Sequence, residues 1–280
     1  MFCVRCEPDM LIKKKSVEKE ESTQLATTTG KPAGGRKPRY SSLIISESGG
    51  VRYLHFGTEW IQGAMRIRDP YKIELAYGRQ MMVWMLFVDN PAHIVQLGLG
   101  TGALTKFSYQ HFPEAKMTAV ELNPDVISVC HSMFALPAPD KRLSVLEMDA
   151  MDFVLDKSNR GTADIIHVDL YDATEKGPVL DTPAFYEACS QCLTDTGMMT
   201  VNLFGEHKSY KKNRNAIQKS FPYVLSMPKC EEGNVVVLAF KKMPDPDFRK
   251  MMETARQIKG DTGIAALKWV TELKQAIKNQ

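Results

Sequence analysis

The sequence predicts an α/β fold with a mostly parallel sheet and a small β-unit in front of it. Strand-like and helical segments alternate from His93 onward, which is the pattern of consecutive βαβ units. Short β-prone runs, separated by glycine turns, precede this region. The chain has 280 residues, of which 44% are hydrophobic, so a sizeable core needs neither a disulfide nor a metal.

The first 40 residues differ in composition from the rest of the chain. They hold nine Lys or Arg and five Asp or Glu, whereas the other 240 residues hold 27 and 28. Because segments such as Lys31–Arg39 contain little that could pack, we expect residues 1–40 to form a flexible basic tail. Its basic cluster could contact phosphate or anionic lipid, but a solvated arm is favoured. The nearly neutral remainder gives no indication of a nucleic-acid-binding surface.

The cysteines and the hydropathy of the chain indicate the cellular compartment of the protein and whether a metal site is expected. Cys3-Val-Arg-Cys6 is a C-x-x-C, but no second ligand pair with zinc spacing follows it, so we expect no metal site. Cys189 and Cys192 fall on a predicted helix among apolar residues, where buried free thiols are expected. No run of 18 apolar residues occurs, and residues 1–21 lack the apolar core of a secretory signal. These features predict a cytoplasmic protein without a membrane partner.

Residues 41–90 are expected to form the small N-terminal β-unit and a helix linking it to the main domain. Glycine-containing turns separate three β-prone runs at Ser41–Ser48, Val51–Gly57 and Glu59–Ile67. Tyr71–Val88 follows Asp69-Pro70 and has apolar residues at helical spacing, so we predict a single helix there.

Residues 91–242 are expected to form the main, Rossmann-like catalytic domain. Its predicted parallel strands are Ile94–Gly98, Met117–Leu122, Leu143–Met148, Ile165–Leu170 and Met198–Phe204. The predicted helices between and after them are Ala103–His111, Pro124–Phe134, Met151–Leu155, Pro183–Leu193 and Lys208–Ser220. Two final strand runs, Tyr223–Met227 and Val235–Phe240, have no helix between them and should form an antiparallel hairpin at one edge of the sheet.

This order of elements narrows the fold. Five βα units followed by a β-hairpin is the order of the S-adenosylmethionine-dependent methyltransferase fold, whose mostly parallel seven-stranded sheet ends in an antiparallel hairpin. A dinucleotide dehydrogenase more often continues with further βα units. Residues 243–280 complete the chain and are expected to form two amphipathic helices broken at Gly260–Gly263.

Polar residues follow the parallel strands at the edge where an open sheet binds its ligands. Gly98-Leu99-Gly100-Thr101-Gly102 follows the first strand, and its glycines allow a tight turn and close approach to a ligand. Glu121, about 20 residues further on, suits both hydroxyls of a ribose, and Asp149 suits the amine of an adenine. The loop also fits a nicotinamide site through Ala103, and a lone strand-end Asp is often a helix cap. Together these features predict an adenosyl-ligand site.

The fourth strand is followed by Asp169-Leu170-Tyr171-Asp172. Two nearby carboxylates can hold a cationic amine, and one of them can accept its proton before the amine attacks an electrophile. The alternative is structural, in which Asp172 caps a turn and Asp169 orders the loop.

At these residues the sequence resembles the spermidine synthase family of aminopropyltransferases, over residues 41–242. The resemblance implies a small N-terminal β-domain, a methyltransferase-fold domain and a homodimer. It also implies transfer of the aminopropyl group of decarboxylated S-adenosylmethionine to a diamine such as putrescine, releasing methylthioadenosine. The family's Asp-Ser-Ser-Asp signature matches Asp169 as catalytic base and Asp172 as amine ligand.

Further site residues are implied by the same resemblance. Trp60-Ile61-Gln62 resembles the segment where family members carry a cofactor-contacting Gln, and Tyr77 corresponds to a tyrosine of the amine pocket. The expected substrate-binding residues are therefore Asp172, Tyr77, Gln62 and Tyr171. The expected cofactor-binding residues are Gly98, Gly100, Thr101, Gly102, Glu121, Leu122, Asp149 and Ala150.

Two positions depart from the family pattern. Thr101 stands where family members carry an Asp that binds the free amine of the aminopropyl chain, and Ala173 replaces a proline. The sequence is most similar to a divergent bacterial branch labelled spermidine synthase-like, which shares the Gly-Leu-Gly loop and the pattern of Tyr77–Met82. Thr101 supplies no charge, so selection of decarboxylated over intact S-adenosylmethionine is left open.

The leading hypothesis is an aminopropyltransferase acting on a small polyamine. A methyltransferase using intact S-adenosylmethionine is the alternative that Thr101 favours, whereas the Asp169/Asp172 pair and the β-unit oppose it. A non-catalytic adenosine-ligand-binding protein is a third alternative, opposed by the presence of both acids. A nicotinamide oxidoreductase fits least, because the terminal hairpin and the acid pair have no role in it.

Overall fold

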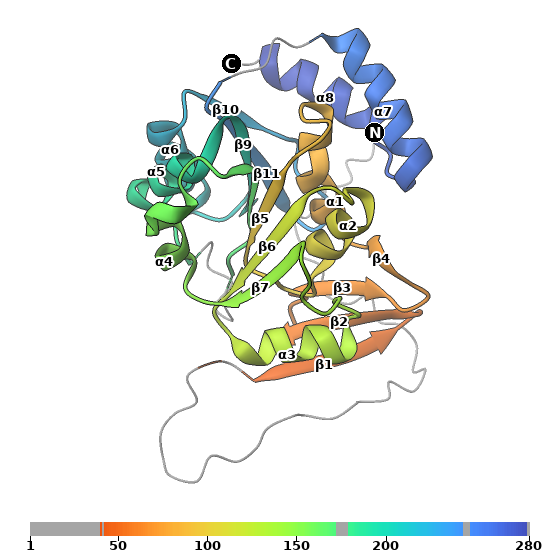
Figure 1. Ribbon diagram of the computed structural model, residues 1–280. Helices are drawn as coiled ribbons and strands as arrows, with labels where there is room; N and C mark the ends of the chain where they lie inside the picture. Colours follow the sequence, from red (N-terminus) through yellow and green to blue (C-terminus); the bar gives the residue numbers. More distant parts are fainter. Residues whose placement is uncertain (1–39, 41, 172–178, 243–246, 279–280) are drawn as a thin grey trace, which may run out of the picture.

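The computed structural model describes residues 40, 42–171, 179–242 and 247–278. It contains a seven-stranded sheet in the order β10-β11-β9-β8-β5-β6-β7 and a four-stranded sheet in the order β1-β2-β3-β4 (Figure 1). The first sheet is parallel except for its β10-β11 edge, so the predicted fold class is confirmed. The basic tail with Cys3 and Cys6, and Asp172, lie outside the described residues.

The small sheet is antiparallel throughout and has one more strand than the sequence indicates. Its strands are β1 (Leu43–Ser48), β2 (Val51–Phe56), β3 (Gly63–Arg66) and β4 (Asp69–Ile73). The single helix predicted at Tyr71–Val88 is wrong, because its first residues form β4 and the rest forms α1 (Ala76–Met81) and the 3₁₀ helix η1 (Met82–Leu86). Pro70 lies inside β4, which is tolerated because β4 is an edge strand.

The large sheet agrees closely with the predicted segments. Its parallel strands are β5 (His93–Leu97), β6 (Lys116–Glu121), β7 (Leu143–Glu147), β8 (Ala163–Val168) and β9 (Leu193–Phe204). The hairpin strands are β10 (Tyr223–Ser226) and β11 (Asn234–Phe240). The intervening helices are α2 (Ala103–His111), α3 (Pro124–Met133), α4 (Ala150–Leu155), η2 (Lys157–Asn159), α5 (Pro183–Cys192) and α6 (Tyr210–Ser220).

Side-chain caps explain where several of these helices begin. Asn123 accepts a hydrogen bond from the backbone N–H of Asp125, and Thr182 accepts one from Phe185. In both helices a proline follows the cap, at a position whose missing N–H would have no helical partner. Because only Leu122 and Asn123 separate β6 from α3, the cap at Asn123 also fixes the end of β6, where Glu121 lies.

The two faces of the large sheet are buried by different helices. Helices α4, α5 and α6 cover one face, where Cys189 and Cys192 are buried free thiols as predicted. The other face packs against α1, η1, α2 and the C-terminal helices α7 (Phe248–Thr262) and α8 (Leu267–Lys278).

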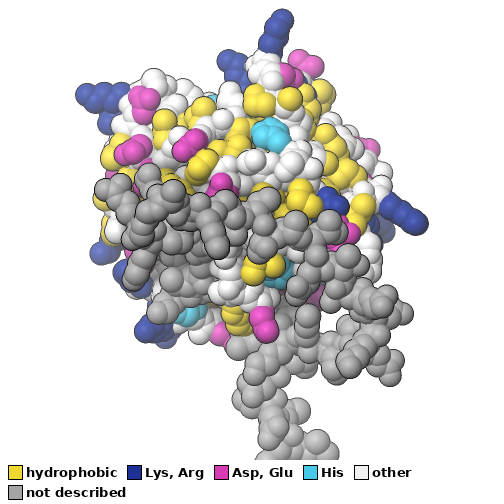
Figure 2. Space-filling model, turned by 90° about the horizontal axis from the view of Figure 1, so that it is seen from below, with side chains coloured by type: hydrophobic (Ala, Val, Ile, Leu, Met, Phe, Trp, Pro, Cys, Tyr) yellow, Lys and Arg dark blue, Asp and Glu magenta, His cyan; other side chains and the backbone are white. Residues whose placement is uncertain are grey.

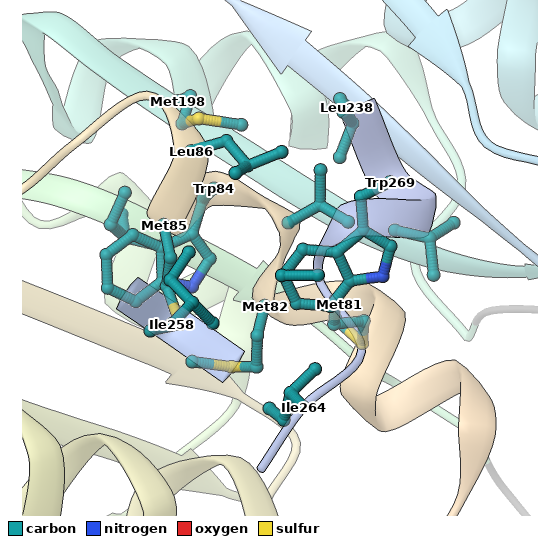
Figure 3. Packing of buried hydrophobic residues seen from close by; sticks show 14 of the residues in the cluster. Met81, Met82, Trp84, Met85, Leu86, Met198, Leu238, Ile258, Ile264 and Trp269 are labelled. Carbon is teal, nitrogen blue, oxygen red and sulfur yellow. The ribbon is translucent and has the colours of Figure 1, made fainter. Parts of the chain in front are cut away.

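The C-terminal helices complete a core around η1. Trp269 and Ile264 pack against Met81 and Met82, close to the buried ring of Trp84 (Figure 3). The helices are separated just after Gly263, which has φ +73° in the left-handed region. Gly260 lies within α7. Of the predicted break at Gly260–Gly263, only the last residue, Gly263, lies beyond the helix.

The surface of the described residues was compared for charged patches, exposed apolar side chains and membrane-spanning helices. Figure 2 shows one face of the molecule, on which Lys and Arg side chains stand around the outline rather than gather in one patch. Large apolar side chains exposed on the small β-unit include those of Ile44, Trp60 and Ile61. Within the described ranges we find no helix with the length and hydropathy needed to span a bilayer.

Candidate active site

The glycine loop brings the end of β5 against the end of β8. Gly98 has φ +88°, and a Cβ on it would lie 2.2 Å from the backbone oxygen of Asp169. Only glycine tolerates both conditions. Gln96 stabilises the loop through its side-chain amide. The amide nitrogen donates to the backbone oxygen of Gly98 at 2.8 Å, and the amide oxygen accepts from the hydroxyl of Thr105. The sequence analysis did not single out Gln96, although a buried amide within an apolar strand is itself a signal.

Glu121 lies at the end of β6 beside this loop. Its Oε2 accepts a hydrogen bond from the backbone N–H of Leu99 at 2.9 Å, and its Oε1 accepts one from Asn123 at 2.9 Å. Burial raises the pKa of Glu121, and these backbone hydrogen bonds partly offset the rise. Each oxygen keeps a lone pair, so the carboxylate can accept two further hydrogen bonds from neighbouring hydroxyls.

Asp149 follows β7 and caps α4. Its Oδ1 accepts a hydrogen bond from the backbone N–H of Met151 at 2.8 Å, so the capping interpretation holds for one of its oxygens. Two exposed apolar side chains, Leu122 and Met148, directly follow the neighbouring strands β6 and β7, and Ala150 is buried. This edge of the sheet therefore combines exposed apolar surface with a carboxylate, which suits a flat heteroaromatic ring. The sequence analysis included Leu122 and Ala150 but missed Met148.

Asp169 directly follows β8 and lines the candidate site. Its Oδ1 accepts a hydrogen bond from the side-chain amide of Asn202 at 2.8 Å, and its Oδ2 accepts a long one from the hydroxyl of Tyr77 at 3.4 Å. Burial raises the pKa of Asp169 to about 6 from 3.8, and the two hydrogen bonds partly oppose the rise. A carboxylate with this pKa is ionised at neutral pH and is a better proton acceptor than an ordinary Asp.

A row of polar side chains on β9 and β11 orients Asp169. Asn202 accepts a hydrogen bond from Asn234 at 2.8 Å through its side-chain oxygen, while its amide faces Asp169. The hydroxyl of Tyr171 donates to the backbone oxygen of Asn202 at 2.8 Å. Tyr171 therefore contacts Asn202 in this structure and is not among the residues that line the pocket described below. Asn202 and Asn234 were missed in the sequence, although both are polar residues within buried apolar strands.

A small pocket lies between the small β-unit and the large sheet. The β-unit contributes Gln62, Gly63 and Ala64, α1 contributes Tyr77, and the far wall includes Asp169. The pocket thus brings together five predicted site residues from distant parts of the chain, namely Gln62, Tyr77, Gly100, Thr101 and Asp169. The β-unit therefore belongs to the site, because its residues form part of the pocket wall.

Thr101 is buried in this pocket wall. Its hydroxyl lies 3.5 Å from the backbone oxygen of Ala64, and its relative exposure is 2%. A Cβ on Gly63 would lie 2.6 Å from the methyl group of Thr101, so β3 and the glycine loop are in direct contact. The side chain at position 101 consequently sets both the fit of the β-unit and the charge at this end of the pocket.

The phenol of Tyr77 lies in a negative environment. Its pKa is raised by burial first, and then by the negative charges of Asp169 and Glu232. The pocket therefore offers negative potential around a neutral hydroxyl, which favours a cationic occupant. Among the described residues we find no group of three acids, histidines or cysteines arranged to hold a metal ion.

Comparison with known proteins identifies the family. Residues 74–250 match the model of the spermine/spermidine synthase domain. The chain belongs to the spermine/spermidine synthase family. A polyamine aminopropyltransferase of Chromobacterium violaceum is 35% identical over 233 residues, which is 82% of this chain and 88% of that protein. A polyamine aminopropyltransferase of Neisseria meningitidis is 30% identical over 246 residues, or 87% of this chain and 93% of its own.

Solved structures share the fold of this spermine/spermidine synthase family member. A probable spermidine synthase from Corynebacterium glutamicum superposes with a TM-score of 0.65 at 17% identity, covering 86% of this chain and 93% of its own. A spermidine synthase in complex with the transition-state analogue AdoDATO gives a TM-score of 0.63 at 19% identity, covering 81% and 79%.

Proposed function

We propose that this protein is an aminopropyltransferase. It transfers the aminopropyl group of decarboxylated S-adenosylmethionine to a small diamine such as putrescine, giving a spermidine-like product and methylthioadenosine. Membership of the spermine/spermidine synthase family supports this reaction class. The two relatives named polyamine aminopropyltransferase, each aligned with more than four fifths of the chain, support it further.

The observation that carries the proposal is the half-buried carboxylate of Asp169, held by Asn202 and Tyr77 beside the glycine loop. The acceptor amine arrives as an ammonium ion and gives one proton to Asp169. The neutral nitrogen then attacks the aminopropyl carbon that is bonded to sulfur. The C–N bond forms, the C–S bond breaks and sulfur keeps the electron pair. Because the sulfonium is an activated leaving group, the protein mainly supplies orientation and proton removal.

The adenosyl part of the co-substrate is proposed to lie along the ends of β5, β6 and β7. Glu121 would accept hydrogen bonds from the ribose hydroxyls, and Asp149 would accept one from the adenine amine. Leu122 and Met148 offer apolar surface to the adenine ring. The glycine loop and Ala150 leave room for the nucleoside because they carry little or no side chain.

The aminopropyl and amine groups are proposed to occupy the pocket lined by Gln62, Tyr77 and Asp169. Asp172 is proposed as a further ligand of the amine. Tyr171 is proposed to assist indirectly, through its hydrogen bond to Asn202.

A methyltransferase acting on intact S-adenosylmethionine is the second candidate. Thr101 favours it, because a neutral side chain at this position offers no carboxylate to the free amine of an aminopropyl chain. The half-buried Asp169 and the part of the pocket wall formed by the β-unit favour the first candidate.

Three further attributes belong to the proposal. Cytoplasmic residence fits the free thiols of Cys130, Cys189, Cys192 and Cys230. A homodimer fits the apolar side chains exposed on the small β-unit.

The chain is proposed to act as three structural units, residues 41–90, 91–242 and 243–280, without a metal or a nucleic-acid partner.

The proposal is tested with the wild type and Asp169→Asn, each incubated with decarboxylated S-adenosylmethionine and putrescine. Wild type should release methylthioadenosine and an aminopropylated amine, both identified by mass. Asp169→Asn should lose at least about 100-fold in turnover, the usual contribution of a general base. Its affinity for methylthioadenosine should change little. A variant that keeps most of its turnover would overturn the assignment of Asp169 as base.

A further inference from the structure

A second cavity adjoins the active-site pocket, between α2 and the large sheet. Helix α2 contributes Leu104, Thr105 and Ser108 to its wall, and strands β5, β6 and β8 contribute the other residues. Gln96 and Leu104 line both the cavity and the active-site pocket. Only shared side chains therefore separate this cavity from the proposed co-substrate site.

Two polar groups of this cavity have no hydrogen-bond partner among the described residues. They are the ring nitrogen Nε2 of His167 and the hydroxyl of Ser108, and both atoms are shielded from solvent. The two residues are 0% and 1% exposed. A buried polar group without a partner is costly, so two of them on one cavity indicate that a hydrogen-bonding molecule occupies it.

The ring of His167 is held by its other nitrogen. Nδ1 lies 2.6 Å from the hydroxyl of Thr200, the register partner of His167 on β9. Burial lowers the pKa of His167 from 6.5 to about 3, so the imidazole is neutral at physiological pH. A neutral imidazole has one donor and one acceptor nitrogen, so Nε2 either donates or accepts, depending on the tautomer.

The chemistry of the wall favours a small neutral occupant. Among the described residues that line the cavity, only His167 is titratable, so an ion would find no opposite charge there. Water can donate to Nε2 or accept from it, and internal waters typically make about three hydrogen bonds. Thr105 supplies a third polar group, because it lies one helical turn before Ser108 on the same face of α2 and lines the cavity too.

Thr105 connects the cavity to the glycine loop. Its hydroxyl donates to the side-chain oxygen of Gln96, and the side-chain nitrogen of Gln96 donates to the backbone oxygen of Gly98 at 2.8 Å. Because this hydroxyl donates its only proton to Gln96, it can still accept from a water. Gln96 and His167 are register partners on β5 and β8, and Gly98 and Asp169 stand two residues further along the chain in each case. The cavity is therefore adjacent to both the glycine loop and the segment that carries the proposed base.

We propose that this cavity binds one ordered water molecule, which bridges His167 to Ser108 and Thr105 and thereby stabilises Gln96 in the orientation that supports the glycine loop. The three bridged residues are positioning residues, because they do not touch the reacting groups. The water site is independent of the reaction that the enzyme catalyses, whereas its effect on the co-substrate rests on the proposed function.

Crystal structures of the full chain, as wild type and as Ser108→Ala, test the site directly. Wild type should show an ordered water within hydrogen-bond distance of Nε2 of His167 and of the hydroxyl of Ser108. Ser108→Ala removes one partner, so the density of this water should weaken or disappear and the side chain of Gln96 should be less ordered. An empty cavity in wild type, or an occupant other than water, would overturn the proposal.

The effect on the glycine loop is measured as affinity for methylthioadenosine by calorimetry. Ser108→Ala should weaken binding about 2–10-fold, the range expected for one neutral hydrogen bond. Ser108→Thr keeps a hydroxyl and should recover most of the affinity. In turnover the loss should appear in KM for decarboxylated S-adenosylmethionine, whereas a merely destabilised protein would have a smaller active fraction and a lower kcat.

Ser132→Ala is the matched control, because Ser132 is exposed on α3 and its hydroxyl donates to the backbone oxygen of Ser128 in the same helix. It should leave both the water and the affinity unchanged. If Ser108→Ala bound methylthioadenosine as tightly as Ser132→Ala, the link between the water and the loop would be refuted. If wild type did not bind methylthioadenosine, the proposed adenosyl site would fail instead, and the crystal structures alone would decide the water site.

Discussion

The backbone oxygen of Asp169 lies where a side chain on Gly98 would have to be, only 2.2 Å from the position of a Cβ. The glycine loop and the proposed base are therefore packed against each other through backbone atoms alone. Any side chain at position 98 must displace the segment that carries Asp169. Stability and catalysis are coupled at this contact.

Replacing Gly98 with alanine should cost about 2–4 kcal/mol in unfolding free energy, from a strained φ of +88° and from overpacking. Turnover should fall more than stability explains, because Asp169 shifts. The control is Gly161→Ala, which has φ +65° but no atom within 4 Å of the new Cβ. It should cost only about 1 kcal/mol. Equal losses in denaturant unfolding would show that the contact with Asp169 is unimportant.

The pH dependence of catalysis should report Asp169. Since the base must be ionised, kcat/KM should rise with pH through an apparent pKa of about 6. The hydrogen bond from Tyr77 lowers this pKa, so Tyr77→Phe should move the acidic limb to higher pH. Profiles of kcat/KM between pH 5 and 9 measure both values. A limb that Tyr77→Phe leaves unmoved, or moves to lower pH, would contradict this assignment.

Asp169 should also reduce stability at neutral pH. Its pKa is about 6 in the folded protein and 3.8 when unperturbed, so the unfolded chain loses this proton first. The contribution of Asp169 to stability therefore falls as pH rises from about 4 to about 6. Asp169→Asn should raise Tm relative to wild type at pH 8, with a smaller gain at pH 4.5.

The control for this stability effect is Asp195→Asn. Asp195 is fully exposed, with Lys241 at 3.7 Å, so its charge should matter little. Thermal unfolding of the three proteins at both pH values makes the comparison. A lower Tm for Asp169→Asn at pH 8 would show that Asp169 is needed for folding.

Position 101 should govern the choice of co-substrate. Thr101→Asp places a carboxylate at the end of the pocket and should improve discrimination for decarboxylated over intact S-adenosylmethionine about 10-fold, as expected for one charged hydrogen bond. It should also lower Tm, because the new charge is buried near the backbone oxygen of Ala64. Thr101→Asn is the uncharged control. Binding of the two co-substrates by calorimetry gives the ratio, and an unchanged ratio refutes this role.

The C-terminal helices should be required for stability. Trp269 is 5% exposed and packs with Met81 and Met82, so Trp269→Ala should cost about 3–5 kcal/mol. Trp60→Ala is the matched control, because Trp60 is 40% exposed. Its unfolding free energy should change by less than about 1 kcal/mol. A small effect at Trp269 would mean that α8 is only loosely attached.

Much of the fold was predictable because it depends on local patterns. The alternation of strands and helices, the final hairpin and the caps at Asn123 and Thr182 are all short-range signals. The helix predicted at Tyr71–Val88 is wrong because Pro70 does not start a helix but lies in the edge strand β4, which pairs with β3. That pairing depends on tertiary structure, which a local pattern does not contain.

The site was predictable only in part for a similar reason. The glycine loop and Asp169 stand in recognisable positions relative to their strands. Asn202 and Asn234 became evident only when β8, β9 and β11 were brought together, because each is bonded to a residue more than 30 positions away. Their partners are set by the strand order of the sheet.

The central claim is aminopropyl transfer, and product analysis tests it most directly. The purified protein is incubated with putrescine and either decarboxylated or intact S-adenosylmethionine, and the products are identified by mass spectrometry. We predict methylthioadenosine and an aminopropylated amine from the decarboxylated donor. Formation of S-adenosylhomocysteine and a methylated product from the intact donor, without aminopropyl transfer from the decarboxylated one, would contradict the account.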